Sequence, residues 1–142
     1  MSRWTATRVL AALGIKAKAP KALEFSSVTT DTRTLTPGSL FVALSGERFD
    51  GHRFLEAARK AGARGAVVRR GTEPVTGLAL FEADDPLDAL GRLARARRND
   101  ITGPVIAITG TNGKTATKEL VDRKSTRLNS SHSLTSRMPS SA

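Results

Sequence analysis

The strongest constraint on the fold is the run LFVAL at residues 40–44. All five residues are apolar and do not alternate with polar ones, as in a strand whose two faces are both covered. Asp50 can cap a helix after it, which Gly62 ends, and the apolar residues 66–68 then predict another strand. The order strand, helix, strand predicts a βαβ unit and therefore an α/β fold.

Further elements are expected on both sides of this unit. Before it, apolar spacing predicts a helix over 4–13 ended by Gly14 and a strand over 25–30, followed by a turn at 36–39. After it, a strand is expected over 78–81. A helix should then start at Pro86, with Asp85 as its cap.

The same spacing predicts which side chains the two later helices bury. The expected inner faces are Phe54, Ala57, Ala58 and Ala61 in the first, and Leu87, Leu90 and Ala94 in the second. The arginines at 92, 95, 97 and 98 are expected to form a solvated face on the last helix.

Composition excludes several kinds of chemistry. The 142-residue chain has no Cys, which excludes disulfides and thiolate sites, and its two histidines are His52 and His132. No apolar run approaches the roughly 20 residues that span a bilayer, and no secretory signal is visible at the N-terminus. A net charge of +10 is compatible with nucleic-acid binding, but the basic residues are scattered and aromatic content is only 4%.

Residues 122–142 differ from the rest of the chain. They are rich in Ser, Thr and Arg and show no helix or strand periodicity. The segments DRKSTRLNSSH and SRMPSSA are also what a common short-read sequencing adapter encodes when it is translated in one frame. We therefore interpret 122–142 as a disordered adapter translation, with a natural tail as the alternative.

A phosphate-binding pattern precedes this segment. The apolar residues 104–109 predict a buried strand, which runs into GTNGKT at 110–115 and then into helix-forming residues. Glycine-rich turns of this kind surround phosphates with backbone N–H groups at a helix N-terminus. Lys114 can reach the β- and γ-phosphates, and the Thr115 hydroxyl can bind Mg²⁺. The common spacing places a glycine at 108, where Ile stands, so the loop is a variant, and a plain strand-to-helix turn is the alternative.

These motifs together resemble the Mur ligases, the ATP-dependent amide-forming enzymes of peptidoglycan synthesis. The similar segments are TGTNGKT at 109–115, TDTR at 30–33, PGSLFVAL at 37–44 and GERFDGH at 46–52. The resemblance implies an ATP site formed by Gly110, Thr111, Asn112, Gly113, Lys114, Thr115 and Ala116, with Lys114 catalytic and Thr115 on Mg²⁺. The family usually has another Thr where Ala116 stands.

The resemblance also implies a site for a UDP-sugar peptide in the N-terminal part. Its residues would be Thr32, Arg33, Gly46, Glu47, Arg48, Asp50 and His52.

Each of these positions has an ordinary structural explanation as well. Asp31 and Asp50 can cap turns, Arg33 can form an ion pair, and His52 can pack or cap a helical first turn.

Within the family, SGERFDGH and TTDTR favour the ligase that joins D-alanyl-D-alanine to UDP-N-acetylmuramoyl-tripeptide through an acyl phosphate. The ligase that adds the third residue of the stem peptide is the alternative, as is a non-catalytic module that binds UDP-sugars. The resemblance implies ATP and Mg²⁺ as cofactors, a cytoplasmic monomer, and neither nucleic acid nor membrane as partner.

The expected organisation has three parts. Residues 1–82 would be a small α/β domain of Mur-ligase type for the UDP-sugar peptide, and 83–121 the first strand, P-loop and helix of a truncated parallel-sheet ATPase domain. Residues 122–142 would be the adapter translation. Because the family's remaining Mg²⁺ ligands and C-terminal domain would lie beyond 121, we expect no ligase activity from this chain.

Overall fold

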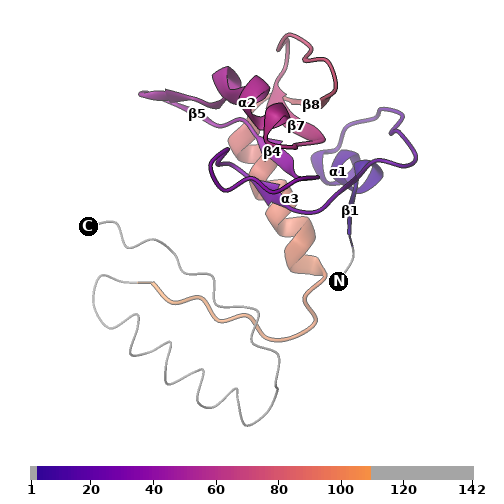
Figure 1. The fold of residues 1–142 in the computed structure, drawn as a ribbon. Coiled ribbons are helices and arrows are strands. Elements are labelled where there is room, and N and C mark those ends of the chain that lie inside the picture. Colours follow the sequence, from indigo (N-terminus) through magenta and orange to yellow (C-terminus); the bar gives the residue numbers. More distant parts are fainter. Residues whose placement is uncertain (1–2, 110–142) are drawn as a thin grey trace. The chain divides into compact units, whose positions relative to one another are not determined.

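The computed structural model describes residues 3–109 of the chain. The part up to Thr102 is one compact unit built on a four-stranded sheet (Figure 1). Its strands lie in the order β3 (Val28–Thr29), β4 (Leu40–Val42), β7 (Gly65–Arg69) and β8 (Ala79–Ala83), and all neighbours are parallel. The α/β class and the parallel arrangement expected from the sequence are confirmed.

Strand β4 is buried on both faces, as its unbroken apolar run predicts. Leu40 and Val42 belong to one hydrophobic cluster, whereas Phe41 and Ala43 belong to a second cluster on the other face. Each of these four residues is at most 1% exposed. Adjacent side chains of a strand point to opposite faces, so a strand covered on both sides needs an apolar residue at every position.

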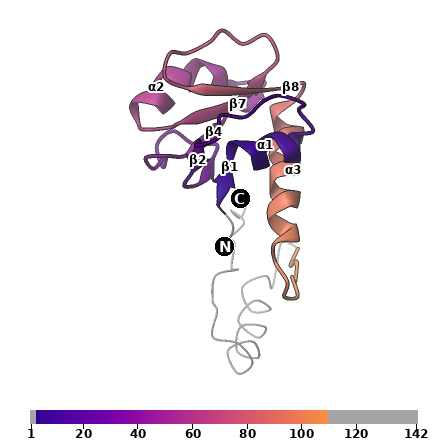
Figure 2. The ribbon, with the colours of Figure 1, turned by 90° about the vertical axis from the view of Figure 1, so that its right-hand side faces the viewer.

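Two layers of helix cover the sheet (Figure 2). Helices α1 (Ala6–Leu13) and α3 (Pro86–Asn99) supply the cluster that contains Leu40, while α2 (Leu55–Lys60) supplies the one that contains Phe41. Helix α1 begins where the Thr5 side chain accepts a hydrogen bond from the Arg8 N–H, and it ends at Gly14, whose φ of 68° is the left-handed conformation that glycine tolerates.

The single strand predicted over 25–30 is wrong, because the structure has two short strands there. The chain instead forms β2 (Glu24–Phe25), which pairs antiparallel with β1 (Trp4–Thr5), and then β3 in the main sheet. Between them the Ser26 N–H donates to the Gly38 carbonyl at 3.0 Å, and the Ser27 hydroxyl bonds that of Ser39 at 2.7 Å. The backbone changes partners at these two serines, which ends one strand and begins the next.

The turn predicted at 36–39 is confirmed and anchors the start of β4. The Ser39 N–H donates to the Thr36 carbonyl at 3.2 Å, and Gly38 has a φ of 87°. Ser39 is fully buried, and its hydroxyl also donates to the Thr36 carbonyl at 2.6 Å.

The buried face predicted for the second helix is wrong at Phe54 and Ala57, whereas Ala58 is buried and Ala61 half-buried. Leu55 and Ala58 are buried, but Phe54 is 40% exposed and Ala57 is also exposed. The cause is the first turn, η1 (Gly51–Phe54), which is a 3-10 helix. Its tighter winding of about three residues per turn shifts the phase of the α-helix that follows.

The face predicted for α3 is displaced in part: Leu90 is half-buried and packs against the cluster that contains Leu40, but Leu87 and Ala94 are exposed. Asp85 caps the helix by accepting from the Leu87 N–H at 3.0 Å, as expected. The buried residues are Pro86, Ala89 and Leu93, whereas Leu87 is 64% exposed. Pro86 at the first helical position is itself buried, so its neighbours at i+3 and i+7 face the core in place of Leu87 and Ala94.

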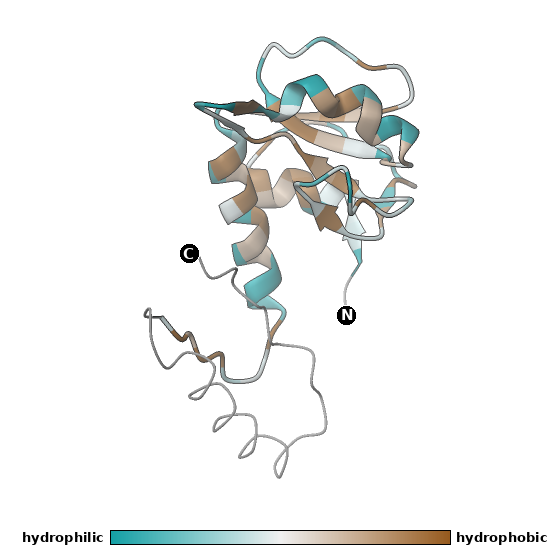
Figure 3. Cartoon of the chain, turned by 60° about the vertical axis from the view of Figure 1, so that its left-hand side comes forward, coloured by the Kyte–Doolittle hydropathy of each residue, from teal (hydrophilic) through white to brown (hydrophobic). Residues whose placement is uncertain are grey.

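The last turns of α3 are hydrophilic (Figure 3), as predicted from the arginines. Arg92, Arg95 and Arg98 are exposed, while Arg97 is half-buried and lies 3.6 Å from Asp100. Because α3 packs on the sheet, the boundary expected between 82 and 83 falls inside the compact unit, which continues to Thr102.

Residues 103–109 belong to a second unit and form no helix or strand. The strand predicted over 104–109 is therefore not formed in the structure. A strand is completed by hydrogen bonds to a neighbour, and no described strand pairs with this segment. Val105 and Ile106 are 48% and 61% exposed.

We expect Leu93→Ala to lower the free energy of unfolding by about 2–4 kcal/mol, because it opens a cavity where Leu93 is 1% exposed. Leu87→Ala in the same helix is the matched control and should change it by less than about 0.5 kcal/mol. Urea unfolding followed by fluorescence of Trp4, the single tryptophan, measures both. Equal effects of the two substitutions would contradict this assignment of the buried face.

Candidate functional site

The N-terminal candidate residues follow the carboxyl ends of two adjacent strands. The segment 30–33 follows β3, and the hairpin of β5 (Ser45–Gly46) and β6 (Phe49–Asp50) follows β4. Because β3 and β4 are parallel neighbours, both segments leave the same edge of the sheet. In open α/β sheets this edge is where ligands bind.

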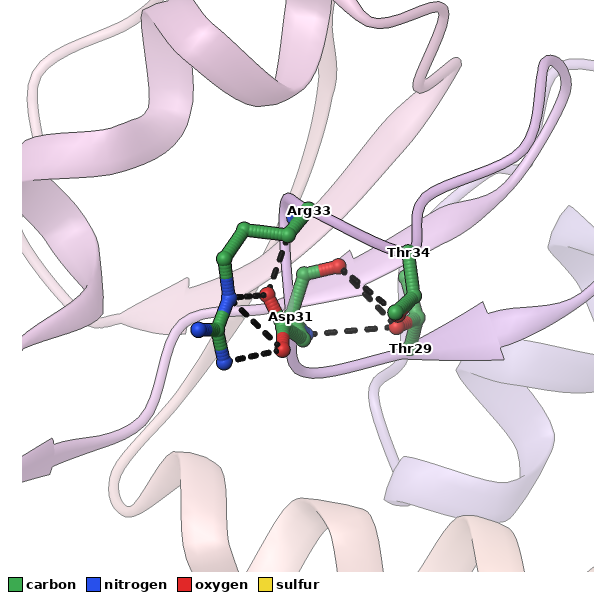
Figure 4. A network of polar contacts seen from close by, with 4 residues as sticks. All are labelled: Thr29, Asp31, Arg33 and Thr34. Carbon is green, nitrogen blue, oxygen red and sulfur yellow. Dashed lines mark hydrogen bonds and ion pairs between the residues drawn. The ribbon is translucent and has the colours of Figure 1, made fainter.

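The segment after β3 is a tight turn organised by Asp31 (Figure 4). The Asp31 N–H donates to the Thr29 hydroxyl at 3.2 Å, and the Asp31 carboxylate accepts from the Arg33 N–H at 2.9 Å. Arg33 also folds its guanidinium onto this carboxylate, with Nε–Oδ1 at 3.0 Å and Nη2–Oδ2 at 2.8 Å. The turn and the ion pair that were expected as ordinary explanations of Asp31 and Arg33 are thus both present.

This pairing changes the acidity of Asp31. Hydrogen bonds from the Arg33 side chain, and then from its backbone, lower the pKa of Asp31 from 3.8 to about 2. The same carboxylate raises the pKa of Arg33. Arg33 keeps 87% of its side chain exposed, so its remaining N–H groups stay accessible beside a neutralised pair. Thr32, next to it, is half-buried.

The hairpin carries charge and aromatic surface. Glu47 and Arg48 form its exposed tip, and within the described residues Arg48 makes no hydrogen bond or ion pair. At its base the rings of Phe49 and Phe54 stack with centroids 5.6 Å apart and planes at 17°, and they are 49% and 40% exposed. The hairpin and the η1 turn that follows it therefore offer an accessible guanidinium and a flat apolar surface close together in the sequence.

The hairpin joins the sheet at a glycine with no space for a side chain. The Gly51 N–H donates to the Leu44 carbonyl at 2.7 Å. A Cβ on Gly51 would lie 2.7 Å from the Leu44 carbonyl oxygen and 2.9 Å from the Leu44 nitrogen. Both are backbone atoms, so the residue after β6 must be glycine for the chain to approach β4 this closely.

His52 follows this glycine and is mostly buried, with 14% of its side chain exposed. Its Nδ1 lies 2.7 Å from an Asp50 carboxylate oxygen, and its Nε2 accepts from the Arg69 N–H at 2.9 Å. The same Asp50 oxygen caps η1 by accepting from the His52 N–H at 3.1 Å. Hydrogen bonds from His52 are the main cause of a lowered pKa of Asp50.

Two residues at the site were not found from the sequence. Arg69, at the end of β7, donates from Nη2 to the Ser45 hydroxyl at 2.6 Å, in addition to its backbone bond with His52. The second residue is Ser45. Arg69 follows the apolar residues of β7 and Ser45 those of β4, so both lie at the carboxyl ends of parallel strands, where ligands bind in such sheets. That position was the available signal.

A hollow lies at the opposite end of the sheet, where the strands begin. It has a volume of about 440 Å³ and is open to solvent. Its lining residues are Arg3, Trp4, Glu24, Phe25, Ser26, Gly38, Arg64 and Arg97. None of the predicted site residues within 3–109 lines it. The motif residues of that part lie instead at the carboxyl ends of β3 and β4, which is why we place the candidate site there.

The predicted ATP site lies outside the described residues. This applies to all seven of its positions, Gly110, Thr111, Asn112, Gly113, Lys114, Thr115 and Ala116, and so to the catalytic and Mg²⁺ roles. Within 3–109, no group of three or more His, Asp or Glu side chains could hold a metal ion. No helix of this part is long and apolar enough to cross a membrane.

Comparison with known proteins identifies the family. The profile of the Mur ligase family, catalytic domain, matches residues 24–98, which include both the Asp31 turn and the hairpin. The chain belongs to the Mur ligase family.

Two relatives illustrate the range of Mur ligases that the chain resembles. It is 45% identical over 103 residues to UDP-N-acetylmuramoyl-tripeptide--D-alanyl-D-alanine ligase of Synechocystis, which covers 70% of this chain and 22% of the relative. It is 40% identical over 103 residues to UDP-N-acetylmuramoyl-L-alanyl-D-glutamate--2,6-diaminopimelate ligase of Geobacter metallireducens. That match covers 71% of this chain and 20% of the relative. The chain thus spans about a fifth of the length of these relatives.

Solved structures agree with this assignment. The D-alanyl-D-alanyl ligase structure from Acinetobacter baumannii matches with a TM-score of 0.76 and 35% identity, over 90% of this chain and 29% of that one. The MurF ligase from Thermotoga maritima in complex with ADP matches with a TM-score of 0.56 and 34% identity, over 67% of this chain and 22% of that one. Both have a fold in common with the described part of the chain.

We expect Arg33→Ala to return the pKa of Asp31 from about 2 toward 3.8. Because the carboxylate form of Asp31 is favoured in the folded chain, the lowered pKa contributes to stability above pH 3.8, and this contribution disappears as the pH falls toward 2. The Arg33→Ala variant should therefore be less stable than wild type above pH 3.8, and the difference should shrink as the pH falls toward 2. Carboxyl carbon NMR titration measures the pKa. Arg70→Ala, which removes the partner of Asp84, is the control and should leave Asp31 unchanged.

We expect Gly51→Ala to lower the free energy of unfolding by about 2–4 kcal/mol, because the new Cβ meets the backbone of Leu44. Gly46→Ala, with no atom within 4 Å of its Cβ position, should change it by less than about 0.5 kcal/mol. Thermal and urea unfolding measure both. A Gly51→Ala chain as stable as the Gly46→Ala chain would contradict the close approach.

Proposed function

We propose that this chain carries the UDP-sugar-binding part of a ligase that joins D-alanyl-D-alanine to UDP-N-acetylmuramoyl-tripeptide. The observation that carries the proposal is the 45% identity over 103 residues to a ligase of that name. The family profile matches residues 24–98, which contain the Asp31 turn and the hairpin. Ligases that add 2,6-diaminopimelate match with lower identity, which makes them the alternative.

The geometry of the carboxyl edge suits a nucleotide sugar. Arg48 presents an accessible guanidinium, and such groups bind phosphate oxygens through charge-assisted hydrogen bonds. The exposed faces of Phe49 and Phe54 offer apolar surface beside it. Backbone groups of 30–33 lie at the same edge, with Arg33 held next to them by Asp31. These residues would bind the substrate and orient it, without taking part in bond formation.

The chemical step belongs to the proposed P-loop. Gly110, Gly113 and their neighbours would surround the ATP phosphates with backbone N–H groups, Lys114 would neutralise the transferred phosphoryl group, and Thr115 would bind Mg²⁺. A matched solved structure holds ADP, which supports a nucleotide site in the family. The phosphorylated carboxylate of the tripeptide would then be attacked by the amine of D-alanyl-D-alanine, with release of phosphate. We place this reaction in the cytoplasm and propose a monomer that binds neither nucleic acid nor membrane.

UDP-N-acetylmuramoyl-tripeptide should raise the midpoint of thermal unfolding of the chain, because a ligand that binds only the folded state stabilises it by about 2.7 kcal/mol at 100 times its Kd. Arg48→Glu should weaken binding, measured by calorimetry, by about tenfold or more. Arg95→Glu on α3 makes the same charge change away from the site and should leave the affinity unchanged.

Absence of any thermal shift at millimolar ligand would overturn the proposal. A clear preference for UDP-N-acetylmuramoyl-L-alanyl-D-glutamate over the tripeptide would favour the alternative ligase. Salt-sensitive binding of DNA with no response to either UDP-sugar would instead indicate a nucleic-acid-binding protein.

A further inference from the structure

The hairpin that carries Arg48 has little stability of its own. Only two residue pairs join its strands, Ser45 with Asp50 and Gly46 with Phe49, and all four residues are exposed. A two-stranded hairpin with no buried face is marginally stable in water. Its position relative to the sheet must therefore come from bonds that its ends make with other elements.

Both ends of the hairpin are bonded to one residue of β7. At the start of β5, the Ser45 hydroxyl accepts from Nη2 of Arg69 at 2.6 Å. After β6, Nε2 of His52 accepts from the backbone N–H of the same Arg69 at 2.9 Å, while Nδ1 of His52 bonds the Asp50 carboxylate at 2.7 Å. His52 thus connects the last residue of the hairpin to the sheet.

The partners of the ring determine its tautomer. A backbone N–H is only a donor, so Nε2 of His52 must present a lone pair to Arg69. The ring proton then lies on Nδ1, where it donates to the Asp50 carboxylate. An imidazolium would place a second N–H against that of Arg69, so the neutral ring is the form that fits. The charged group bonded to the ring is the Asp50 carboxylate, and the ring has 14% of its surface exposed.

We propose that His52 is a positioning residue, which as the neutral Nδ1–H tautomer fixes the hairpin to the carboxyl end of β7. Both ring nitrogens are already bonded to protein atoms, so His52 acts on the ligand through the hairpin and not by direct contact. The consequence for ligand binding rests on the proposed function, because it requires the hairpin to bind the UDP-sugar peptide. The attachment itself does not depend on that function.

The tautomer can be tested without a ligand. The chain has two histidines, so His132→Gln leaves one imidazole signal in long-range ¹H–¹⁵N NMR spectra. At neutral pH we expect a protonated Nδ1 and an unprotonated Nε2 for His52. An Nε2–H tautomer, or an imidazolium at neutral pH, would overturn the proposal.

Two substitutions separate the two bonds of the ring. His52→Gln places an amide oxygen close to where Nε2 lies and keeps an acceptor for the Arg69 N–H. His52→Asn places an amide N–H close to Nδ1, which preserves the bond to Asp50 but loses the one to Arg69. Hydrogen exchange of the Arg69 amide should therefore be faster in His52→Asn than in wild type and close to wild type in His52→Gln. Equal exchange in all three chains would contradict the attachment.

Affinity for UDP-N-acetylmuramoyl-tripeptide gives the second readout. We expect His52→Asn to bind about tenfold more weakly and His52→Gln within about threefold of wild type, in line with the loss of one hydrogen bond. Unchanged affinity in His52→Asn would show that the hairpin needs no such attachment for binding.

If wild type does not bind the UDP-sugar at all, the proposed function fails, and the tautomer and Arg69 exchange still decide the role of His52. If a variant does not fold, the wild-type tautomer decides it.

Discussion

The double burial of β4 is the constraint on which the described unit depends. This strand has hydrogen-bonded neighbours on both sides, β3 and β7, and its two faces lie in different hydrophobic clusters. Its backbone groups therefore bond neighbouring strands, and its side chains are buried in the core. The segments that leave its carboxyl end and that of β3, which are the hairpin and the Asp31 turn, stay partly or fully exposed and carry the proposed binding site. A rigid strand thus supports two short exposed segments, a common division of labour between scaffold and binding loops.

The sequence predicted the parts of this fold that depend on local signals. The unbroken apolar run of β4, the caps Asp85 and Asp50 and the stop at Gly14 were all interpreted correctly. The errors came from tertiary effects. Leu87 is exposed because Pro86 is buried and sets the rotation of α3, and Phe54 is exposed because a 3-10 turn precedes α2. The segment 104–109 has the composition of a strand but no described partner with which to pair.

At the site, sequence motifs located the segments better than they defined the roles of individual residues. The assignment of 30–33 and 46–52 to one candidate site followed from the family resemblance, whereas their place at the carboxyl ends of β3 and β4 came from the structure. What the motif could not show is that two guanidinium N–H groups of Arg33 donate to Asp31, or that both ring nitrogens of His52 are bonded to protein atoms. Arg69 lies outside the motifs, and Ser45 lies within SGERFDGH without being among the predicted site residues, yet the two side chains are hydrogen-bonded at the base of the hairpin. Such partners are set by three-dimensional contact, which spacing along a chain does not reveal.

The strand order β3-β4-β7-β8 has a consequence for biosynthesis. Every strand of the main sheet pairs with a neighbour that is next to it in chain order among the strands of that sheet, so no later strand must be inserted between two earlier ones. The sheet can grow by one edge as the chain emerges from the ribosome, and β7 closes the exposed side of β4 when it arrives. Domains commonly fold as units during synthesis, N-terminal parts first. The hairpin, which is made before Arg69, would then become fixed only after β7 has been added.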